Sequence, residues 1–245
     1  MSDLPVAARL ALAAARELLD GEVCFVGIGN PSDAALLAKH SHAPEMTLIY
    51  ESGVIDSDPT SKPPLSTGSP SVSQGAKMIA DGLAVFSELQ AGRIDVGLLS
   101  AAQVDPRGNL NSTVIGSYHS PKIRMVGSGG AHDIACLVNR LVILMPHDPR
   151  RFKEKVDFIT SPGLSDRRSG LKLPPGPVSL ITERARFSFE SGTAALSAIM
   201  PGYDEEDAVE GLSWEVKKTP DFKLIEKFGN KELVAARSCL KYLCN

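Results

Sequence analysis

Short apolar runs rich in β-branched residues alternate along this chain with segments whose apolar residues have helical spacing. Apolar runs of about four to eight residues between turn residues are typical of buried strands. Strands that alternate with helices are typical of a parallel sheet with helices on both faces. The pattern therefore predicts an α/β fold built on a mostly parallel sheet. The predicted strands are residues 22–29, 47–50, 96–100, 122–126, 140–145 and 156–160, and the predicted helices between them include residues 31–42 and 83–91.

The two ends of the chain extend this pattern. Residues 1–20 are rich in Ala and Leu but carry charges at intervals, which predicts an amphipathic helix rather than a secretory signal peptide. Residues 178–190 predict a pair of strands, and residues 205–212 a short helix. No repeat and no convincing linker divides the chain, so residues 1–245 are expected to form a single domain.

Two polar stretches interrupt the alternation. Residues 56–73 are rich in Pro, Ser, Thr and Asp, and residues 167–177 in Arg, Gly and Pro. The first stretch is long for a passive connector, and such loops often line binding sites or interfaces.

Composition excludes several classes of function. The 26 Lys and Arg residues against 29 Asp and Glu residues give a net charge of −3, so no strong field attracts nucleic acid or anionic lipid. No apolar run reaches the roughly 20 residues that span a bilayer. The four cysteines form no CxxC pair, which disfavours both a metal site and a disulfide framework. We expect free thiols in a reducing cytoplasm.

The first candidate motif is residues 26–33, where a predicted strand runs through two glycines into a helix. Glycines at this place let the amides of Ile28 and Gly29 approach an anion or a reacting oxygen. Asn30 is a suitable N-cap for the helix. The motif is not the dinucleotide fingerprint, because Ser32 replaces its third glycine. A tight turn without any ligand is an equally good interpretation of this segment alone.

The second candidate is Glu51, which follows an apolar strand and precedes Ser52 and Gly53. Ligands of parallel α/β sheets bind beyond the carboxyl ends of the strands. A carboxylate with restricted hydration at such a place can serve as a nucleophile or general base. The alternative is an exposed glutamate at the sheet edge, or one paired with Lys or Arg.

The third candidate is the glycine cluster at residues 127–131, which follows a predicted strand and leads into a helical segment. Its unshielded amides can donate to a thioester oxygen or a phosphate. A flexible turn is the alternative.

Other polar residues are weaker candidates. Residues 105–109 have the composition of a tight turn, from which Gln103 and Asn111 can reach a cleft. His119 is a further candidate for a pocket residue. The basic run at residues 150–155 is interpreted as the solvated face of a helix.

Several of these motifs, in this order, resemble class I coenzyme A transferases, and in particular the β (B) subunit of the glutaconate CoA-transferase type. The resemblance covers most of residues 5–215. The matching segments are VGIGNP at 26–31, ESGVID at 51–56, AAQVDPRGNLNST at 101–113, IGSYHSPKIRMVGSGGA at 115–131 and RRFKEKVDFITSPG at 150–163.

The resemblance implies a ping-pong mechanism in which Glu51 is the nucleophile and carries CoA as a glutamyl thioester. It implies an acyl-CoA donor, a dicarboxylic or other carboxylic acid as acceptor, and no permanently bound cofactor or metal. It also implies a homologous α subunit as partner, in an α2β2 assembly. The groups expected to bind CoA or stabilise an oxyanion are Ile28, Gly29, Gly53, Gly127, Gly129, Gly130 and Ala131, and the pocket candidates are Asn30, Gln103, Asn111 and His119.

Two alternatives stay open at this point. Some relatives of the same fold hydrolyse CoA thioesters or open carbon rings, and a loosened pocket would admit water to the same intermediate. A non-catalytic protein that binds a small metabolite is the other alternative, and Glu51 beside the intact glycine cluster argues against it.

Overall fold

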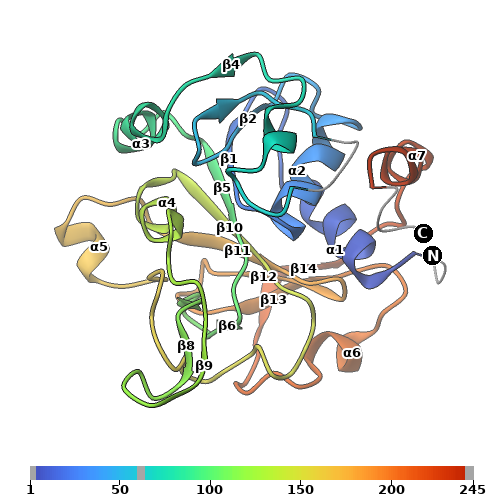
Figure 1. Ribbon diagram of the computed structural model, residues 1–245. Coiled ribbons are helices and arrows are strands. Elements are labelled where there is room, and N and C mark those ends of the chain that lie inside the picture. Colours follow the sequence, from blue (N-terminus) through green and yellow to red (C-terminus); the bar gives the residue numbers. More distant parts are fainter. Residues whose placement is uncertain (1–3, 60–63, 241–245) are drawn as a thin grey trace.

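The computed structural model describes residues 4–59 and 64–240 and has a large mixed sheet at its centre (Figure 1). Ten strands form this sheet in the order β14-β13-β12-β11-β10-β5-β1-β2-β3-β4. The five consecutive strands β11, β10, β5, β1 and β2 are parallel to their neighbours in this block, as the apolar runs predict. They span Pro177–Ile181, Arg140–Leu144, Val96–Leu99, Val23–Val26 and Thr47–Ile49.

Five further strands extend the two edges of the parallel block. Beyond β2 lie β3 and β4, and beyond β11 lie β12 and β13, all with antiparallel pairing. The outermost strand, β14, pairs in parallel with β13. These strands span Val54–Ile55, Met78–Ile79, Ala185–Ser188, Ala195–Ile199 and Lys218–Leu224.

Alternate residues of the central strands face two separate apolar cores. In β1, Cys24 and Val26 join one core and Phe25 joins the other. Helices α1, α2 and α7 complete the first core, whereas α3 and α4 complete the second. The sheet is therefore covered by helices on both faces, as predicted. These helices span Val6–Ala15, Asn30–Lys39, Asn230–Cys239, Gly82–Gln90 and Ala131–Leu137.

The first helix differs from the amphipathic helix that its charges predict. In α1 every residue from Leu10 to Ala15 is buried. The reason is that α1 contacts α2, α7 and β11 at once and so has no wide solvent face. Its one internal charge, Arg9, lies over the ring of Tyr203 at 5.6 Å.

Three segments depart from their predicted structure. Residues 122–126 do form a strand, β9 (Pro121–Arg124), but it pairs only with β8 (Val114–Gly116) in a separate ribbon. Residues 156–160 form no strand: the Asp157 side chain bonds to Gln103 and to the amide of Gly116, and among these described residues only Thr160 makes a backbone–backbone bond, to Leu110 O. Residues 150–155 form no helix, since backbone bonds tie Arg151 and Lys153 to Val104.

A second small ribbon and two short helices complete the fold. The ribbon pairs β6 (Gln103–Val104) with β7 (Leu110–Asn111), and a turn closed by the bond from Gly108 N to Asp105 O joins them as predicted. The short helices are α5 (Arg167–Gly170) and α6 (Glu205–Val209), and a 3₁₀ turn, η1, covers Pro70–Ser73.

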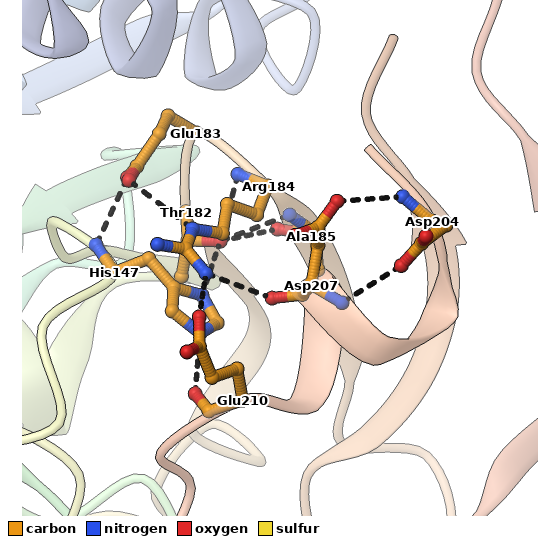
Figure 2. A network of polar contacts seen from close by, with 8 residues as sticks. All are labelled: His147, Thr182, Glu183, Arg184, Ala185, Asp204, Asp207 and Glu210. Atoms are coloured by element: carbon orange, nitrogen blue, oxygen red, sulfur yellow. Dashed lines mark hydrogen bonds and ion pairs between the residues drawn. The ribbon is translucent and has the colours of Figure 1, made fainter. Parts of the chain in front are cut away.

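A polar network ties the end of β10 to the β11–β12 turn and to α6 (Figure 2). The amide of His147 donates to Glu183, and the ring of His147 contacts Thr182 Oγ1 at 3.3 Å and Glu210 O at 2.9 Å. Arg184 pairs with Glu210 at 2.6 Å. A carbonyl oxygen only accepts, so Nε2 of His147 carries a proton in this arrangement.

Within residues 4–59 and 64–240, no helix is long and apolar enough to cross a membrane. The same residues contain no group of three or more His, Cys, Asp or Glu side chains arranged to hold a metal ion. Cys24, Cys136 and Cys239 are free thiols, and Cys244 lies outside the described residues.

Candidate active site

The candidate site lies where the strand order changes direction. From β1 the chain continues through α2 to β2 on one side, and later returns through α3 to β5 on the other side of β1. The connections lie on opposite faces of the sheet, so a crevice opens at the carboxyl ends of β1 and β5.

Glu51 enters this crevice from a tight turn after β2. The turn is closed by bonds from Gly53 N to Tyr50 O and from Tyr50 N to Val54 O. Gly53 has a φ of 94°, and a Cβ at this position would lie 2.6 Å from the backbone of Ala80. Only glycine fits there, so the observed contribution of Gly53 is to the backbone that presents Glu51.

The residue before Glu51 is firmly anchored. The hydroxyl of Tyr50 lies 2.8 Å from Ser32 Oγ in the first turn of α2, and the side chain is fully buried. Burial raises the pKa of Tyr50 to about 12, so it stays neutral at physiological pH. The strand end and the start of α2 are thus joined directly beneath the site.

The carboxylate of Glu51 accepts one hydrogen bond on each oxygen. Gly130 N donates to Oε2 at 3.1 Å, and Thr67 Oγ1 donates to Oε1 at 2.9 Å. In the described part of the chain these donors are an amide and a hydroxyl, and neither is cationic. A carboxylate held in this way keeps unused lone pairs for a reaction.

The glycine cluster forms the cavity wall next to Glu51. Gly127 and Gly129 have φ values of 88° and 47°, and the loop is tied down by bonds from Gly127 N to Ser112 O and from Ala131 N to Ser128 O. Across residues 4–59 and 64–240, the amides of Ser128 and Gly129 have no backbone acceptor. A Cβ on Gly130 would lie 2.6 Å from Phe86 Cζ and 2.7 Å from Glu51 Oε2. Gly130 is therefore closely packed between the nucleophile candidate and an aromatic ring.

A cavity of about 410 Å³ opens in front of these groups. Its lining comes from the ends of β1 and β5, from the turn after β2, from the loop before η1, and from the glycine cluster with the start of α4. The lining residues are Phe25, Val26, Gly27, Ile28, Pro31, Glu51, Leu65, Ser66, Thr67, Leu99, Ser100, Ser112, Val126, Gly127, Ser128, Gly129, Ala131 and Ile134.

The motif after β1 contributes backbone to this cavity, but its helix begins one residue earlier than predicted. Gly29, with a φ of 81°, is the N-cap, and Asn30 is already the first residue of α2. The prediction of Asn30 as N-cap was therefore wrong. The reason is that the positive φ required before the helix suits glycine. Ile28 lines the cavity, whereas Gly29 and Asn30 are outside its lining.

Three predicted pocket residues lie elsewhere. Gln103 and Asn111 are buried and bond to each other at 2.7 Å, and Gln103 also bonds to Asp157. They brace the ribbon of β6 and β7. His119 lies exposed between β8 and β9 with its ring against Tyr118. The structure does not bring these three residues to the cavity next to Glu51.

Two residues of the site are not identified by the sequence: Thr67, which bonds to Glu51, and Phe86, which packs against Gly130. Thr67 lies in the polar stretch 56–73, of which residues 60–63 are outside the described part, and composition marks that stretch only as a loop that often lines sites. Phe86 lies in α3, where its pattern is that of one more apolar position of a helix. Its ring packs 5.5 Å from that of Phe25, and nothing in the sequence marks it as a neighbour of Glu51.

An ion-pair cluster anchors Asp56, at the beginning of the polar stretch 56–73. Asp56 is buried, has a φ of 54°, and pairs with Lys39 of α2 and with Lys77. Burial alone would raise the pKa of Asp56, but its hydrogen bonds to Lys39 and Lys77 lower it below the usual value.

Comparison with known proteins gives consistent matches. Residues 7–171 match the family model described as Coenzyme A transferase. The chain is 41% identical over 236 residues to the B subunit of 3-oxoadipate CoA-transferase from Pseudomonas knackmussii, covering 94% of this chain and 90% of that protein. It is 35% identical over 218 residues to the B subunit of glutaconate CoA-transferase from Acidaminococcus fermentans, covering 84% and 81%.

A solved structure agrees with these matches. The crystal structure of glutaconate CoA-transferase from Acidaminococcus fermentans superimposes with a TM-score of 0.86 at 31% identity, covering 96% of this chain and 94% of that one. Sequence, fold and family model lead to one conclusion. The chain belongs to the coenzyme A transferase family and is a class I CoA-transferase subunit of the B type.

Proposed function

We propose that this subunit transfers CoA from an acyl-CoA to a carboxylic acid, with Glu51 as the nucleophile. The observation that carries the proposal is the Glu51 carboxylate at the carboxyl end of a central strand, bonded to the Gly130 amide and opening into the 410 Å³ cavity. A carboxylate is a competent nucleophile towards a thioester when its hydration is restricted.

The proposed chemistry has two steps in each half-reaction. An oxygen of Glu51 attacks the thioester carbon, so that a C–O bond forms, the C–S bond breaks, and CoA leaves as thiolate. The thiolate then attacks Cδ of Glu51, forms the glutamyl-CoA thioester, and expels the acid as a carboxylate. A second acid reverses both steps. Charge and atoms balance without a proton donor or a metal.

The amides around the cavity are proposed to stabilise the oxyanions of these steps. The Gly130 amide already contacts Glu51, and the amides of Ser128 and Gly129 have no backbone acceptor in the described residues. The backbone at Ile28 and Gly29 is proposed to contribute from the opposite wall. An amide donor in such a site typically lowers a barrier by about 3 kcal/mol.

The proposed substrates are an acyl-CoA thioester and a dicarboxylic acid, with no permanently bound cofactor. The relatives with 41% and 35% identity are named for dicarboxylic acids, 3-oxoadipate and glutaconate. The proposed partner is a homologous α subunit, in an α2β2 assembly, since both relatives are named as the B subunits of their enzymes. A cytoplasmic location stays a prediction from the sequence.

The test uses the complex of this chain with its α subunit. The complex is mixed with acetyl-CoA, succinyl-CoA or glutaryl-CoA and with a series of dicarboxylic acids that includes 3-oxoadipate and glutaconate. We expect a new acyl-CoA that forms only when an acceptor acid is present. In Glu51→Gln the rate of its formation should fall by a factor of at least about 10³. Release of free CoA at the same rate with or without acceptor would contradict the transferase proposal and identify a hydrolase.

A further inference from the structure

The two oxygens of Glu51 have different surroundings. Oε2 accepts from the amide of Gly130, and a Cβ on Gly130 would lie 2.7 Å from this oxygen and 2.6 Å from Phe86 Cζ. The backbone of Gly130 therefore occupies one side of Oε2, and the Phe86 ring packs against Gly130 there. A substrate carbon has no room to reach this oxygen from that side.

Oε1 is held by a side chain that faces the cavity. Its donor is Thr67 Oγ1 at 2.9 Å, and Thr67 lines the cavity together with its neighbours Leu65 and Ser66. Within the described residues, neither Gly130 nor Phe86 is part of that lining. Both oxygens lie near Gly129, which also lines the cavity, since a Cβ on Gly129 would lie 3.7 Å from Oε2 and 3.9 Å from Oε1. The oxygens differ in their donors: the donor to Oε1 is a side chain of the cavity lining, whereas the donor to Oε2 is a backbone amide outside it.

We propose that the two oxygens have separate roles and that Thr67 is the positioning residue that separates them. This rests on the proposed function. Oε1 attacks the thioester carbon and becomes the bridging oxygen of the mixed anhydride. Oε2 stays on Glu51 as its carbonyl oxygen.

The two donors then act on different atoms of the same step. When CoA thiolate attacks Cδ of Glu51, negative charge develops on Oε2, where the Gly130 amide is already in place. The bond from Cδ to the bridging oxygen then breaks, and that oxygen leaves on the product carboxylate with the electron pair. The Thr67 hydroxyl lies beside it and donates to the charge that it gains. Hydrogen bonds to charged groups are stronger than those between neutral groups.

The arrangement makes a prediction about both directions of the reaction. The bridging oxygen leaves with the first acid when the thioester forms. When the second acid enters, one of its carboxylate oxygens attacks Cδ of Glu51 and becomes the new bridging oxygen. Loss of the hydroxyl at position 67 must therefore slow both the formation and the discharge of the glutamyl-CoA thioester. A residue that only binds one acyl group would affect one direction and would raise KM.

The experiment compares Thr67→Val with Thr67→Ser in the αβ complex. Valine has nearly the shape of threonine without the donor, whereas serine keeps the hydroxyl. Thioester formation is followed after mixing with acyl-CoA, and thioester discharge after adding acid to the preformed enzyme–CoA. Thr67→Val is expected to lower both rates by roughly 10- to 100-fold with KM changed less than about threefold, and Thr67→Ser to stay within about threefold of the wild type.

The matched control is Ser73→Ala, on the same loop. Ser73 is exposed, its hydroxyl donates to Pro70 O at 2.8 Å, and it is outside the cavity lining. This variant should retain wild-type rates. Thr67→Ala repeats the test with a smaller side chain if the valine variant unfolds at a lower temperature than the wild type.

Two results would overturn the inference. One is a Thr67→Val enzyme whose two rates stay within twofold of the wild type, and the other is a Thr67→Ser enzyme as slow as Thr67→Val. In both cases the proposed function would still stand, provided that Glu51 carries the CoA thioester. Failure to find any thioester on Glu51 in the wild type would instead contradict the proposed function itself.

Discussion

At the scale of single residues, Gly130 is the position where a small change has the clearest expected effect. Alanine there would place Cβ 2.6 Å from Phe86 Cζ and 2.7 Å from Glu51 Oε2, so Glu51 or the ring must move. We expect Gly130→Ala to lower kcat by at least about 100-fold, because Glu51 loses its place against the amide.

The matched control for Gly130→Ala is Gly170→Ala. Gly170 is exposed, and a Cβ on it meets no atom within 4 Å. Steady-state transfer kinetics measure kcat of both variants, and thermal unfolding shows whether both are folded. A Gly130→Ala enzyme with wild-type kcat would show that the close contact between Gly130 and Glu51 is not needed for catalysis.

A second residue-scale prediction concerns pH and His147. Burial lowers the pKa of His147 below its usual 6.5, although the Glu210 carbonyl and the charges of Glu183 and Glu210 act in the opposite direction (Figure 2). Well above pH 6.5 the ring is neutral in both the folded and unfolded chain. Below pH 6.5, His147 binds a proton in the unfolded chain more readily than in the folded chain.

The stability of the fold should therefore fall as the pH drops from about 7.5 to about 5.5, with His147 responsible for up to about 1 kcal/mol. His147→Gln retains a side-chain N–H that can donate to Glu210 O but does not titrate, so its free energy of unfolding should depend less on pH. Urea unfolding at both pH values measures the difference. Equal pH slopes for the wild type and the variant would exclude His147 as the cause.

At the scale of secondary-structure elements, the packing of α4 on β5 positions the glycine cluster. Gly97 lies in the middle of β5, and a Cβ there would lie 2.7 Å from Ile134 Cγ2 and 2.9 Å from Val138 Cγ1. The helix therefore sits directly on the strand, with its first residue, Ala131, immediately after Gly130.

Gly97→Ala is expected to move α4 away from the sheet and to destabilise the fold by about 1–3 kcal/mol, the usual cost of overpacking. Because α4 carries Gly130 at its start, the same variant should also lose transfer activity. Thermal unfolding measures the loss of stability and the transfer assay the loss of activity, with Gly170→Ala as the control in both. Unchanged stability and unchanged activity together would contradict this account of the α4–β5 contact.

The elements that the sequence predicts best are those whose apolar residues meet the core. The four strands β1, β2, β5 and β10 agree with the predicted ranges within a few residues, because their nearly continuous burial requires apolar runs. The helices α2 and α3 agree within a few residues as well. Residues 156–160 look the same in sequence but are held by Asp157 and Thr160 side chains, and local composition does not reveal such long-range bonds.

The candidate site likewise contains residues that the sequence could predict and residues that it could not. Glu51 follows a predicted strand of the central sheet, so its place at the carboxyl edge could be predicted from topology. The glycine cluster follows β9, which lies outside that sheet, so its meeting with Glu51 depends on the packing of α4 on β5. Thr67 could not, since it reaches Glu51 from a polar stretch without periodicity. Gln103 and Asn111 have the polar character of site residues but satisfy each other inside a ribbon.

At the scale of the whole molecule, the prediction is that this chain works only in a complex. The Glu51 cavity has exposed apolar residues at its mouth: Leu65 is 87% exposed and Val126 98%. The mixed anhydride of the proposed mechanism requires that water be excluded. We therefore expect the chain to co-purify in a 1:1 ratio with a subunit of similar size and to show no transfer activity alone. Full activity of the isolated chain would contradict this.

The central claim, that Glu51 carries the transferred CoA, is tested most directly by trapping the thioester. The αβ complex is incubated with an acyl-CoA and no acceptor, treated with borohydride, which reduces a glutamyl thioester to an alcohol, and digested for peptide mass analysis. The account predicts one reduced residue, at position 51, that is absent without acyl-CoA. A reduced residue elsewhere, or none in an enzyme that turns over, would contradict it.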